Sequence, residues 1–308
     1  MTALLLAGHL LVLFLLPILF VGLINRTKAI WSGRKGPPLL QTLFDLVRLL
    51  RKGAVYSTVT TPLFRLGPLV LLATTIVSGL FIPLLGTSVP LTFPFDFVAV
   101  AYLWGLGRIF LMLPALDTGS SFEGMGASRE ATYSALAEPS LFLTLGTLAL
   151  ATGHQSFGDM LHVGVTTPYG FAVTVASVVA MFVILQVESA RAPVDDPNTH
   201  LELTMIHEVM ILDHSGPDLA FVQYAAAMKM TIGAALIAAL LNPFYGQLAS
   251  TLTVAVNVGI TLSIATAIGC IESLIARFKL RAVPQFIVIG LVAAFAALLT
   301  AAWGKGIV

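Results

Sequence analysis

The sequence predicts an all-α integral membrane protein, a bundle of about eight transmembrane helices. Apolar residues make up 57% of its 308 residues, and the mean hydropathy is +0.96. The apolar residues gather into long runs and do not alternate with polar ones, which argues against a β-barrel. A helix needs about 20 apolar residues to cross the hydrocarbon core. The composition therefore argues against a soluble enzyme, and the run lengths favour membrane-spanning helices.

Eight apolar runs supply the predicted spans, each close to the length that crosses a bilayer. They cover residues 3–25, 64–86, 95–115, 131–152, 166–187, 220–241, 251–275 and 284–303. The first run lacks a basic stretch before it and is too long for a typical signal peptide. We therefore expect it to be retained as a helix, within a single transmembrane domain over residues 1–308.

The connection between the first two runs contains one more predicted helix. After the turn-forming GRKGPP, the stretch LLQTLFDLVRLLRKG repeats leucines at helical spacing, with polar and basic residues between them. We expect a cytoplasmic amphipathic helix over about 37–52, lying in the membrane interface because the flanking spans hold it near lipid. A purely soluble amphipathic helix is the alternative.

Lys and Arg residues predict the orientation. Eight of the sixteen lie in the first connection, further ones lie in the third, fifth and seventh, and the second, fourth and sixth carry none. The positive-inside rule then makes the odd connections cytoplasmic and places both termini outside the cell (inner) membrane. The net charge of +1 gives no reason to expect a nucleic-acid partner.

The fifth connection forms an acidic cytoplasmic loop over about 188–218, ESARAPVDDPNTHLELTMIHEVMILDHSGPD. It holds seven of the fifteen carboxylates and three of the six histidines. Crowded acids at the low-dielectric margin of a membrane share protons. His200, His207 and His214 recur every seven residues, so we expect them near one face of a helix that begins at Asn198 or Thr199. Histidines about 10 Å apart are too distant to share one ion, so a metal site is the weaker alternative.

Ionisable residues within the spans are candidates for function, because a charge near the bilayer centre costs roughly 2.5–3.5 kcal/mol. Glu138, Arg108 and Lys229 lie inside predicted spans. Glu188 ends the fifth span, where it could form an i, i+3 pair with Arg191. Glu272 lies near the end of the seventh span, where a solvated helix end remains as good an interpretation as a functional one.

Cysteine usage places electron transfer elsewhere. The single cysteine, Cys270, can form neither an internal disulfide nor an iron–sulfur site. The chain itself is therefore expected to carry no cofactor and to do no redox chemistry.

Four stretches resemble one family: RKGPPLLQTLFDLVRLL, ALDTGSSFEGMGASREA, ESARAPVDDPNTHLEL and IESLIARFKLR. They are similar to the membrane-anchor subunit of formate hydrogenlyase and hydrogenase-4 type complexes, a subunit similar to the H subunit of respiratory complex I. The resemblance spans residues 26–281 in the same order, and the DTGS and GASRE motifs favour the hydrogenase branch.

The resemblance implies a subunit that docks a peripheral arm and couples its redox reaction to ion movement. It implies hydrogenase-like large and small subunits, iron–sulfur subunits and antiporter-like membrane subunits as partners, together with membrane lipid. A [NiFe] centre and iron–sulfur clusters would lie in those partners, whereas quinone binding and the coupled ion are left open. Cationic residues of a soluble partner are expected to pair with the acids of the loop.

The resemblance also assigns roles to residues. Arg191, Pro193 and Asp195 match an ETNRAPFD-like motif, and Glu202 matches the last acid of an EAEAEL-like segment, in which Asn198 and His200 replace acids. Candidates for the proton path or coupling are Glu138, Glu188, Arg191, Asp195, Asp196, Glu202, Glu208, Asp213, Arg108, Lys229 and Glu272. Candidates for docking the arm are Arg34, Lys35, Asp117, Glu123, Arg129, Glu130, His200, His207 and His214.

Other readings remain open at this point. The chain could be the H-type subunit of an NADH-quinone oxidoreductase. It could instead be an autonomous secondary transporter whose Glu138 and Lys229 bind substrate, although no inverted repeat supports this. A purely structural anchor leaves Glu138 unexplained.

Overall fold

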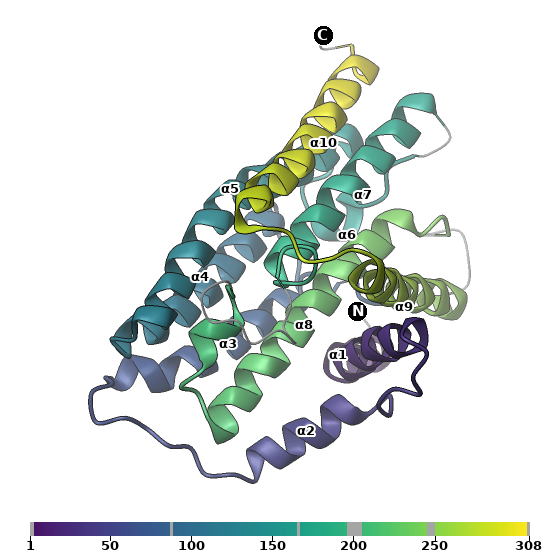
Figure 1. The fold of residues 1–308 in the computed structure, drawn as a ribbon. Helices are drawn as coiled ribbons and strands as arrows, with labels where there is room; N and C mark the ends of the chain where they lie inside the picture. The colour runs from purple at the N-terminus through teal and green to yellow at the C-terminus, as the bar shows by residue number, and fades with distance from the viewer. Residues whose placement is uncertain (1–2, 87–88, 165–166, 196–204, 245–249, 307–308) are drawn as a thin grey trace.

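The computed structural model describes residues 3–86, 89–164, 167–195, 205–244 and 250–306. Within these ranges the chain is helical and has no strand (Figure 1). Eight of the described helices are long and apolar enough to cross a membrane, which confirms the predicted fold class. They are α1 (Ala3–Trp31), α3 (Pro62–Gly79), α4 (Asp96–Asp117), α5 (Ser121–Thr152), α7 (Pro168–Glu188), α8 (Gly216–Leu241), α9 (Ser250–Leu274) and α10 (Val283–Gly304).

Short helices occupy the connections. They are α2 (Gln41–Leu50), α6 (Phe157–Met160) and two 3₁₀ turns, η1 (Glu208–Ile211) and η2 (Leu280–Ala282). The helix α5 begins ten residues before the predicted run at 131, because its polar first turns extend beyond the apolar stretch that a hydropathy pattern detects.

Local chemistry defines where two of the spans begin. Thr61 caps α3 by accepting a hydrogen bond from the Leu63 N–H, and Pro62 occupies the first helical position. Thr167 caps α7 in the same way through the Gly170 N–H, followed by Pro168. Proline fits this position because the first helical N–H has no partner in the helix.

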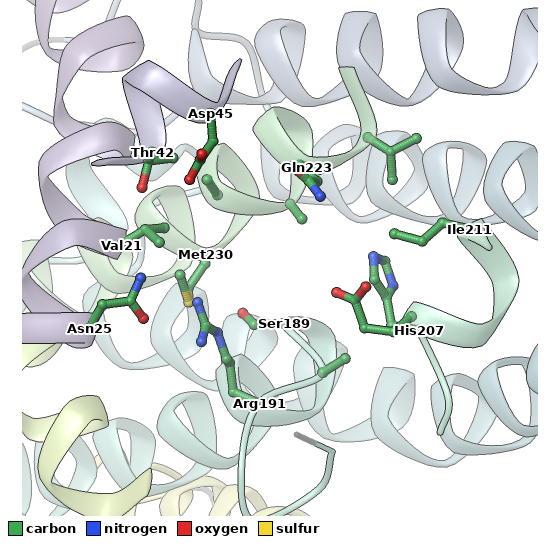
Figure 2. Close-up of a pocket in the computed structure, with 15 residues that line it drawn as sticks. Val21, Asn25, Thr42, Asp45, Ser189, Arg191, His207, Ile211, Gln223 and Met230 are labelled. Carbon is green, nitrogen blue, oxygen red and sulfur yellow. The ribbon is translucent and has the colours of Figure 1, made fainter. Parts of the chain in front are cut away.

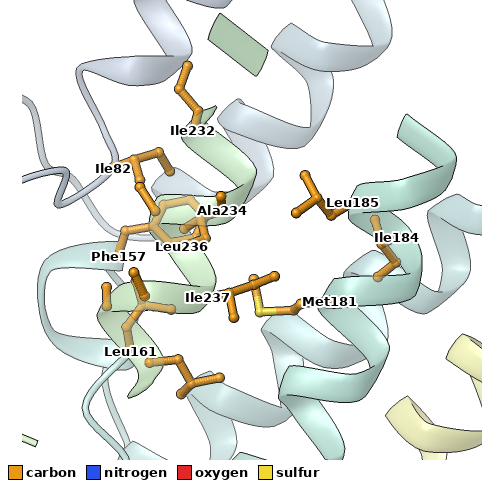
Figure 3. Close-up of a cluster of buried hydrophobic side chains, with 14 of the residues drawn as sticks. Ile82, Phe157, Leu161, Met181, Ile184, Leu185, Ile232, Ala234, Leu236 and Ile237 are labelled. Carbon is orange, nitrogen blue, oxygen red and sulfur yellow. The ribbon is translucent and has the colours of Figure 1, made fainter. Parts of the chain in front are cut away.

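The helix α8 runs through the middle of the bundle (Figure 1). It is the most buried of the eight spans, because 78% of the residues in its most apolar stretch are buried. It packs against α1, α3, α7 and α9, while α10 packs against α5 and α7. Small residues of α8, among them Gly233, Ala234 and Ala238, are buried at these contacts, as is typical where membrane helices approach closely. Figure 3 shows part of this core, in which Ile237 of α8 and Met181 of α7 lie near one another.

The helix α2 lies against α1 and α8 at one end of the bundle (Figure 1). Its Leu46 is buried, whereas Leu43, Phe44 and Val47 are exposed on the face turned away from the bundle. The close approach of α2 to α1 depends on Gly22, because a Cβ there would lie 2.0 Å from the Leu39 carbonyl oxygen. The predicted amphipathic helix is present but shorter than 37–52, and its interfacial position stays a prediction.

The acidic loop does not form the single helix expected from its histidine spacing. From Met205 onward, a turn leads into η1, a second turn follows, and Gly216 opens α8 with a φ of +54°. His207 precedes η1 and His214 follows it, so the two do not share a helical face. The prediction was wrong because the Asp195 carboxylate holds the Ile206 and His207 N–H groups in a turn. Residues 196–204 lie outside the described ranges.

Candidate functional site

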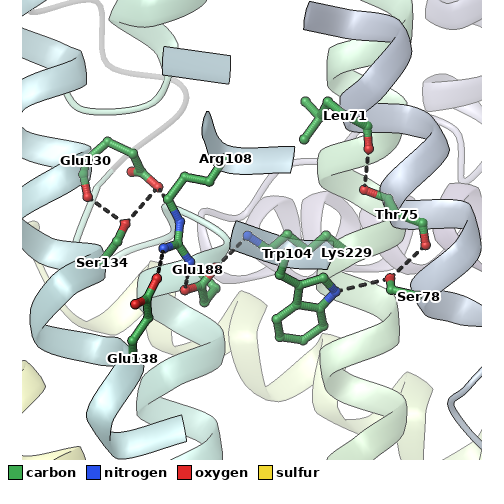
Figure 4. Close-up of polar contacts among 10 residues, drawn as sticks. All are labelled: Leu71, Thr75, Ser78, Trp104, Arg108, Glu130, Ser134, Glu138, Glu188 and Lys229. Carbon is green, nitrogen blue, oxygen red and sulfur yellow. Dashed lines mark hydrogen bonds and ion pairs between the residues drawn. The ribbon is translucent and has the colours of Figure 1, made fainter. Parts of the chain in front are cut away.

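Arg108 on α4 links three helices inside the bundle (Figure 4). Its Nη2 lies 2.5 Å from Oε1 of Glu188 on α7, and its Nη1 lies 2.6 Å from Oε1 of Glu138 on α5. Its Nε lies 3.6 Å from Oε1 of Glu130, also on α5. One guanidinium of α4 therefore joins two carboxylates of α5 and one of α7.

Lys229 on α8 completes this group. Its Nζ lies 2.5 Å from Oε2 of Glu188, so each oxygen of that carboxylate contacts a cation. The ammonium also lies 5.5 Å from the ring centroid of Trp104, within the range of a cation–π interaction. The Trp104 Nε1–H donates to Ser78 Oγ at 3.1 Å, which fixes the indole. Arg108, Glu130, Glu138, Glu188 and Lys229 are called the intramembrane charge cluster below.

The charges of the intramembrane charge cluster do not balance. Two cations face three carboxylates, so the fully ionised cluster has one excess negative charge. Side chains of the cluster are nearly buried except for that of Glu138, which is 46% exposed. Because charges in a low-dielectric interior need compensation, a proton or an external cation can offset the excess, and Glu138 is the carboxylate most accessible to either. The arrangement can thus bind and release a proton.

A second network lies where α1, α9 and the turn after α7 meet. Glu272, with a side chain only 1% exposed, lies 2.8 Å from Lys28 Nζ and 3.3 Å from Arg191 Nη1. Asp195 Oδ1 lies 3.0 Å from Arg277 Nη2, and its Oδ2 accepts from the Ile206 N–H at 2.9 Å. Burial excludes the interpretation of Glu272 as a solvated helix end.

Two expectations about pairing were wrong. Glu188 pairs with Arg108 and Lys229, not with Arg191, because α7 ends at Glu188 and the chain turns away. The loop acids Glu188 and Asp195, expected to pair with cations of a partner, pair with cations of this same chain. Those cations come from distant helices and connections, so the local sequence gave no sign of them.

A cavity of about 320 Å³ lies between α1, α2, α8, η1 and the turn after α7 (Figure 2). Polar side chains line much of it, namely Asn25, Thr42, Asp45, Ser189, Arg191, His207, Glu208 and Gln223. Three predicted coupling or docking residues, Arg191, His207 and Glu208, thus meet at one cavity. Burial lowers the pKa of His207, which favours the neutral ring. This is called the outer cavity below.

The outer cavity lies at the end of the bundle formed by residues 26–65, 117–129, 188–195, 205–216 and 274–283. This end, called the basic end below, carries the basic connections of the sequence. Arg34 and Lys35 are exposed there, in the turn after α1. Asp213 is also exposed there, after η1.

Other predicted docking residues make contacts within the chain. Asp117 accepts from the Thr61 N–H at 2.6 Å, and Arg129 Nη1 donates to the Met205 carbonyl at 2.8 Å. Glu123 is buried and accepts from Thr118 Oγ1 and from the Asp213 N–H. These positions favour a role in holding the basic end together.

His214 is buried and stacks on Phe64, with 4.1 Å between ring centroids. Burial lowers its pKa to about 4, so the ring is neutral near pH 7. Three further candidates, Asp196, His200 and Glu202, lie outside the described residues. Within the described ranges, no three His, Cys, Asp or Glu side chains are grouped closely enough to hold a metal ion.

Sequence reasoning did not identify Lys28, Trp104, Ser189 or Arg277 as site residues. Lys28 and Arg277 belong to basic connections in which no local pattern distinguishes a buried partner from a solvated charge. Trp104 lies in an apolar run, and its proximity to Lys229 arises from helix packing. Ser189 follows Glu188 directly, but the sequence does not show that it lines a cavity beside Lys229. Their roles are visible only in the folded chain.

Comparison with known proteins agrees with this architecture. A profile of the family described as NADH dehydrogenase matches residues 4–302. Hydrogenase-4 component C of Escherichia coli (strain K12) is 33% identical over 236 residues, covering 76% of this chain and 73% of that protein. Formate hydrogenlyase subunit 4 of the same organism is 26% identical over 282 residues, covering 89% of this chain and 91% of that protein.

Among solved structures, the fold is similar to a chain of the membrane-bound sulfane sulfur reductase, an archaeal respiratory membrane complex. The TM-score is 0.76 at 18% identity, covering 95% of this chain and 99% of that one. At this identity the likeness concerns the fold. The family profile spans nearly the whole sequence, so the chain belongs to the NADH dehydrogenase family, as the H-subunit-like motifs in its sequence predicted.

Proposed function

We propose that this chain is the membrane-anchor and proton-coupling subunit of a complex I-like, group 4 [NiFe]-hydrogenase or hydrogenase-related membrane complex. The observation that carries the proposal is the intramembrane charge cluster, in which Arg108 and Lys229 share Glu188 while Glu130 and Glu138 complete an acidic excess. A purely structural anchor does not require such a group inside its spans. The similarity to subunits of hydrogenase-4 and formate hydrogenlyase supports the assignment to this type of complex.

The basic end is the proposed docking face for the peripheral arm. It presents exposed Arg34, Lys35 and Asp213, and it contains the mouth of the outer cavity. Its basic residues favour a cytoplasmic position under the positive-inside rule, with both termini on the other side of the cell (inner) membrane. The outer cavity would then admit protons from the cytoplasm towards the intramembrane charge cluster.

The proposed partners are those that the resemblance in the sequence implies, and the similarity to subunits of hydrogenase-4 and formate hydrogenlyase supports them. Hydrogenase-like large and small subunits and iron–sulfur subunits would form the arm and hold the [NiFe] centre and clusters, and antiporter-like membrane subunits would continue the ion path. A mild-detergent pull-down from native membranes tests this. Recovery of a large subunit with its nickel-binding cysteines establishes a hydrogenase, and a partner without them indicates another redox couple. Recovery of the chain alone would contradict the docking role and favour a transporter.

Glu138→Gln tests the coupling role directly. Gln keeps the shape of the side chain, and Arg108 retains its contact with Glu188, so we expect the complex to assemble. In inverted membrane vesicles, redox-driven proton uptake should fall to near background at unchanged subunit content. The matched control is Asp159→Asn, an exposed carboxylate in α6 outside the cluster, which should leave proton uptake unchanged. Normal uptake in Glu138→Gln would support a purely structural anchor.

A further inference from the structure

A second, smaller cavity lies deeper in the bundle than the outer cavity. It has a volume of about 20 Å³, and its lining includes Glu188 and Lys229 of the intramembrane charge cluster. Apart from these two residues, Trp104 and Ser189, its described walls are aliphatic, Met181 or Gly233. It is called the inner cavity below.

Ser189 is where the two cavities meet. Of the described residues that line them, Ser189 alone belongs to both. It is the first residue after α7, directly following Glu188, and its N–H donates to the Leu185 carbonyl at 3.0 Å. In Figure 2 it lies between Arg191 and His207 of the outer cavity.

The Ser189 hydroxyl has no hydrogen-bond partner among the described residues, although its oxygen is buried. This is unlike Thr174 on α7, whose Oγ1 donates to the carbonyl four residues earlier at 2.9 Å. Leaving a buried hydroxyl unpaired costs roughly 1–3 kcal/mol. A water molecule needs about 10–15 Å³, so the inner cavity is large enough to hold one beside the hydroxyl.

We propose that the Ser189 hydroxyl relays protons between the outer cavity and the Glu188–Lys229 pair. Water in the outer cavity donates a proton to Ser189 Oγ while the hydroxyl passes its own proton to water in the inner cavity. One O–H bond forms on the serine oxygen as another breaks, so the side chain is unchanged and no electron is transferred. Transfer in the opposite direction uses the same atoms.

The surroundings of Ser189 restrict the alternatives. Leu185, Ile184 and Leu236 cannot pass a proton, and they wall the inner cavity around the two charged residues. Trp104 is a donor only, and its Nε1–H is already used by Ser78. A hydroxyl can accept and donate at once, which is what a relay requires.

This inference rests on the proposed coupling function, and its test is designed to separate the two. Ser189→Ala and Ser189→Thr are introduced into the full complex, and inverted vesicles are assayed for subunit content, viologen-linked redox turnover and proton uptake per electron. Ser177→Ala is the matched control, because Ser177 is a buried serine of α7 with an unpaired hydroxyl that lines neither cavity.

We expect Ser189→Ala to lower proton uptake per electron at least about tenfold. A positioned proton-transfer group typically accelerates its step roughly 10²–10⁴-fold, and that acceleration is lost with the hydroxyl. Ser189→Thr should restore uptake because it restores the hydroxyl, and Ser177→Ala should behave as the unmodified complex. Unchanged uptake in Ser189→Ala, with Glu138→Gln still uncoupled, overturns the relay and leaves the coupling function standing. Unchanged uptake in both variants overturns the coupling function itself. A loss in Ser189→Ala that Ser189→Thr does not repair indicates a packing role and overturns the relay.

Discussion

The Arg108 guanidinium lies 2.5 Å from Oε1 of Glu188, which is the last residue of α7. This contact joins α4 to the point where α7 ends, and the second oxygen of the same carboxylate binds Lys229 of α8. A single carboxylate therefore compensates two cations inside the bundle. Its removal leaves both without that partner, which makes Glu188 the residue on which the stability of the cluster depends most.

Glu188→Gln should lower the stability of the detergent-extracted complex by about 3–5 kcal/mol, because Lys229 then has no carboxylate within 4.0 Å among the described residues, whereas Arg108 keeps Glu130 and Glu138. The measurement is thermal unfolding followed at several detergent concentrations. The control is Arg48→Gln, which removes the exposed Arg48–Asp45 pair on α2 and should cost less than about 1 kcal/mol. Equal losses in the two variants would show that the cluster is solvated.

Asp195 has two tasks that substitution can separate. Its Oδ1 pairs with Arg277, and its Oδ2 accepts from the N–H groups of Ile206 and His207. Asp195→Asn keeps an acceptor oxygen for the turn, whereas Asp195→Ala removes it. We expect Ala to be worse than Asn by about 1–3 kcal/mol in thermal unfolding, the cost of leaving a buried donor unpaired. If the two variants are equally destabilised, the ion pair with Arg277, and not the hydrogen bonds to the turn, accounts for the stabilisation by Asp195.

The spans were predictable because hydrocarbon thickness imposes a length on every apolar run. Their ends were less predictable, as α5 shows, because a helix can continue through a polar stretch that hydropathy does not detect. Glu138, Arg108 and Lys229 stood out from the sequence because charges are rare inside spans. That Arg108 and Lys229 both contact Glu188 was not predictable, because this depends on how α4, α7 and α8 pack.

For the loop at 188–218, in contrast, the sequence pattern predicted the wrong local structure. Its histidine period indicated a helix, but the described part is built from turns that Asp195 stabilises. Side-chain bonds to the backbone compete with helix formation, and a period of seven residues does not reveal which prevails. Likewise, no sequence pattern indicates that Glu272 pairs with Lys28, which lies over two hundred residues away along the chain.

His214 predicts a loss of stability in acid. Burial lowers its pKa from an ordinary value of 6.5 to about 4. Between these pH values the unfolded chain binds a proton that the folded chain does not, so stability is full above pH 6.5 and falls as the pH drops towards 4. At about 1.4 kcal/mol per unit of pKa difference, the maximum loss is about 3 kcal/mol.

His214→Phe tests this, because phenylalanine can keep the stacking on Phe64 without titrating. The unfolding temperature of the variant should fall less between pH 7 and pH 5 than that of the unmodified protein. Some dependence will remain, since burial also lowers the pKa values of His207 and His162. Identical pH dependence in the two proteins would place the titrating group elsewhere.

The close packing of α1 against the segment that leads into α2 depends on Gly22. A Cβ at Gly22 would lie 2.0 Å from the Leu39 carbonyl oxygen, a backbone atom that cannot give way without moving the segment that leads into α2. Gly22→Ala should therefore displace α2 and open the outer cavity, whose lining includes Thr42 and Asp45 of that helix. The measurement is limited proteolysis in the exposed turn at 33–36, which should be cut at least about tenfold faster if the local opening free energy falls by about 1.4 kcal/mol.

Gly105→Ala is the matched control for this prediction. Gly105 lies inside α4, and a Cβ there meets no atom within 4 Å. Alanine is favoured over glycine in a helix interior by about 0.8–1 kcal/mol, so this variant should unfold at the same or a higher temperature and keep the proteolysis rate unchanged. Faster cleavage in both variants would mean that glycine flexibility matters generally in these helices. Faster cleavage in Gly22→Ala alone would assign the effect to the contact between Gly22 and Leu39, because that contact is what distinguishes the two positions.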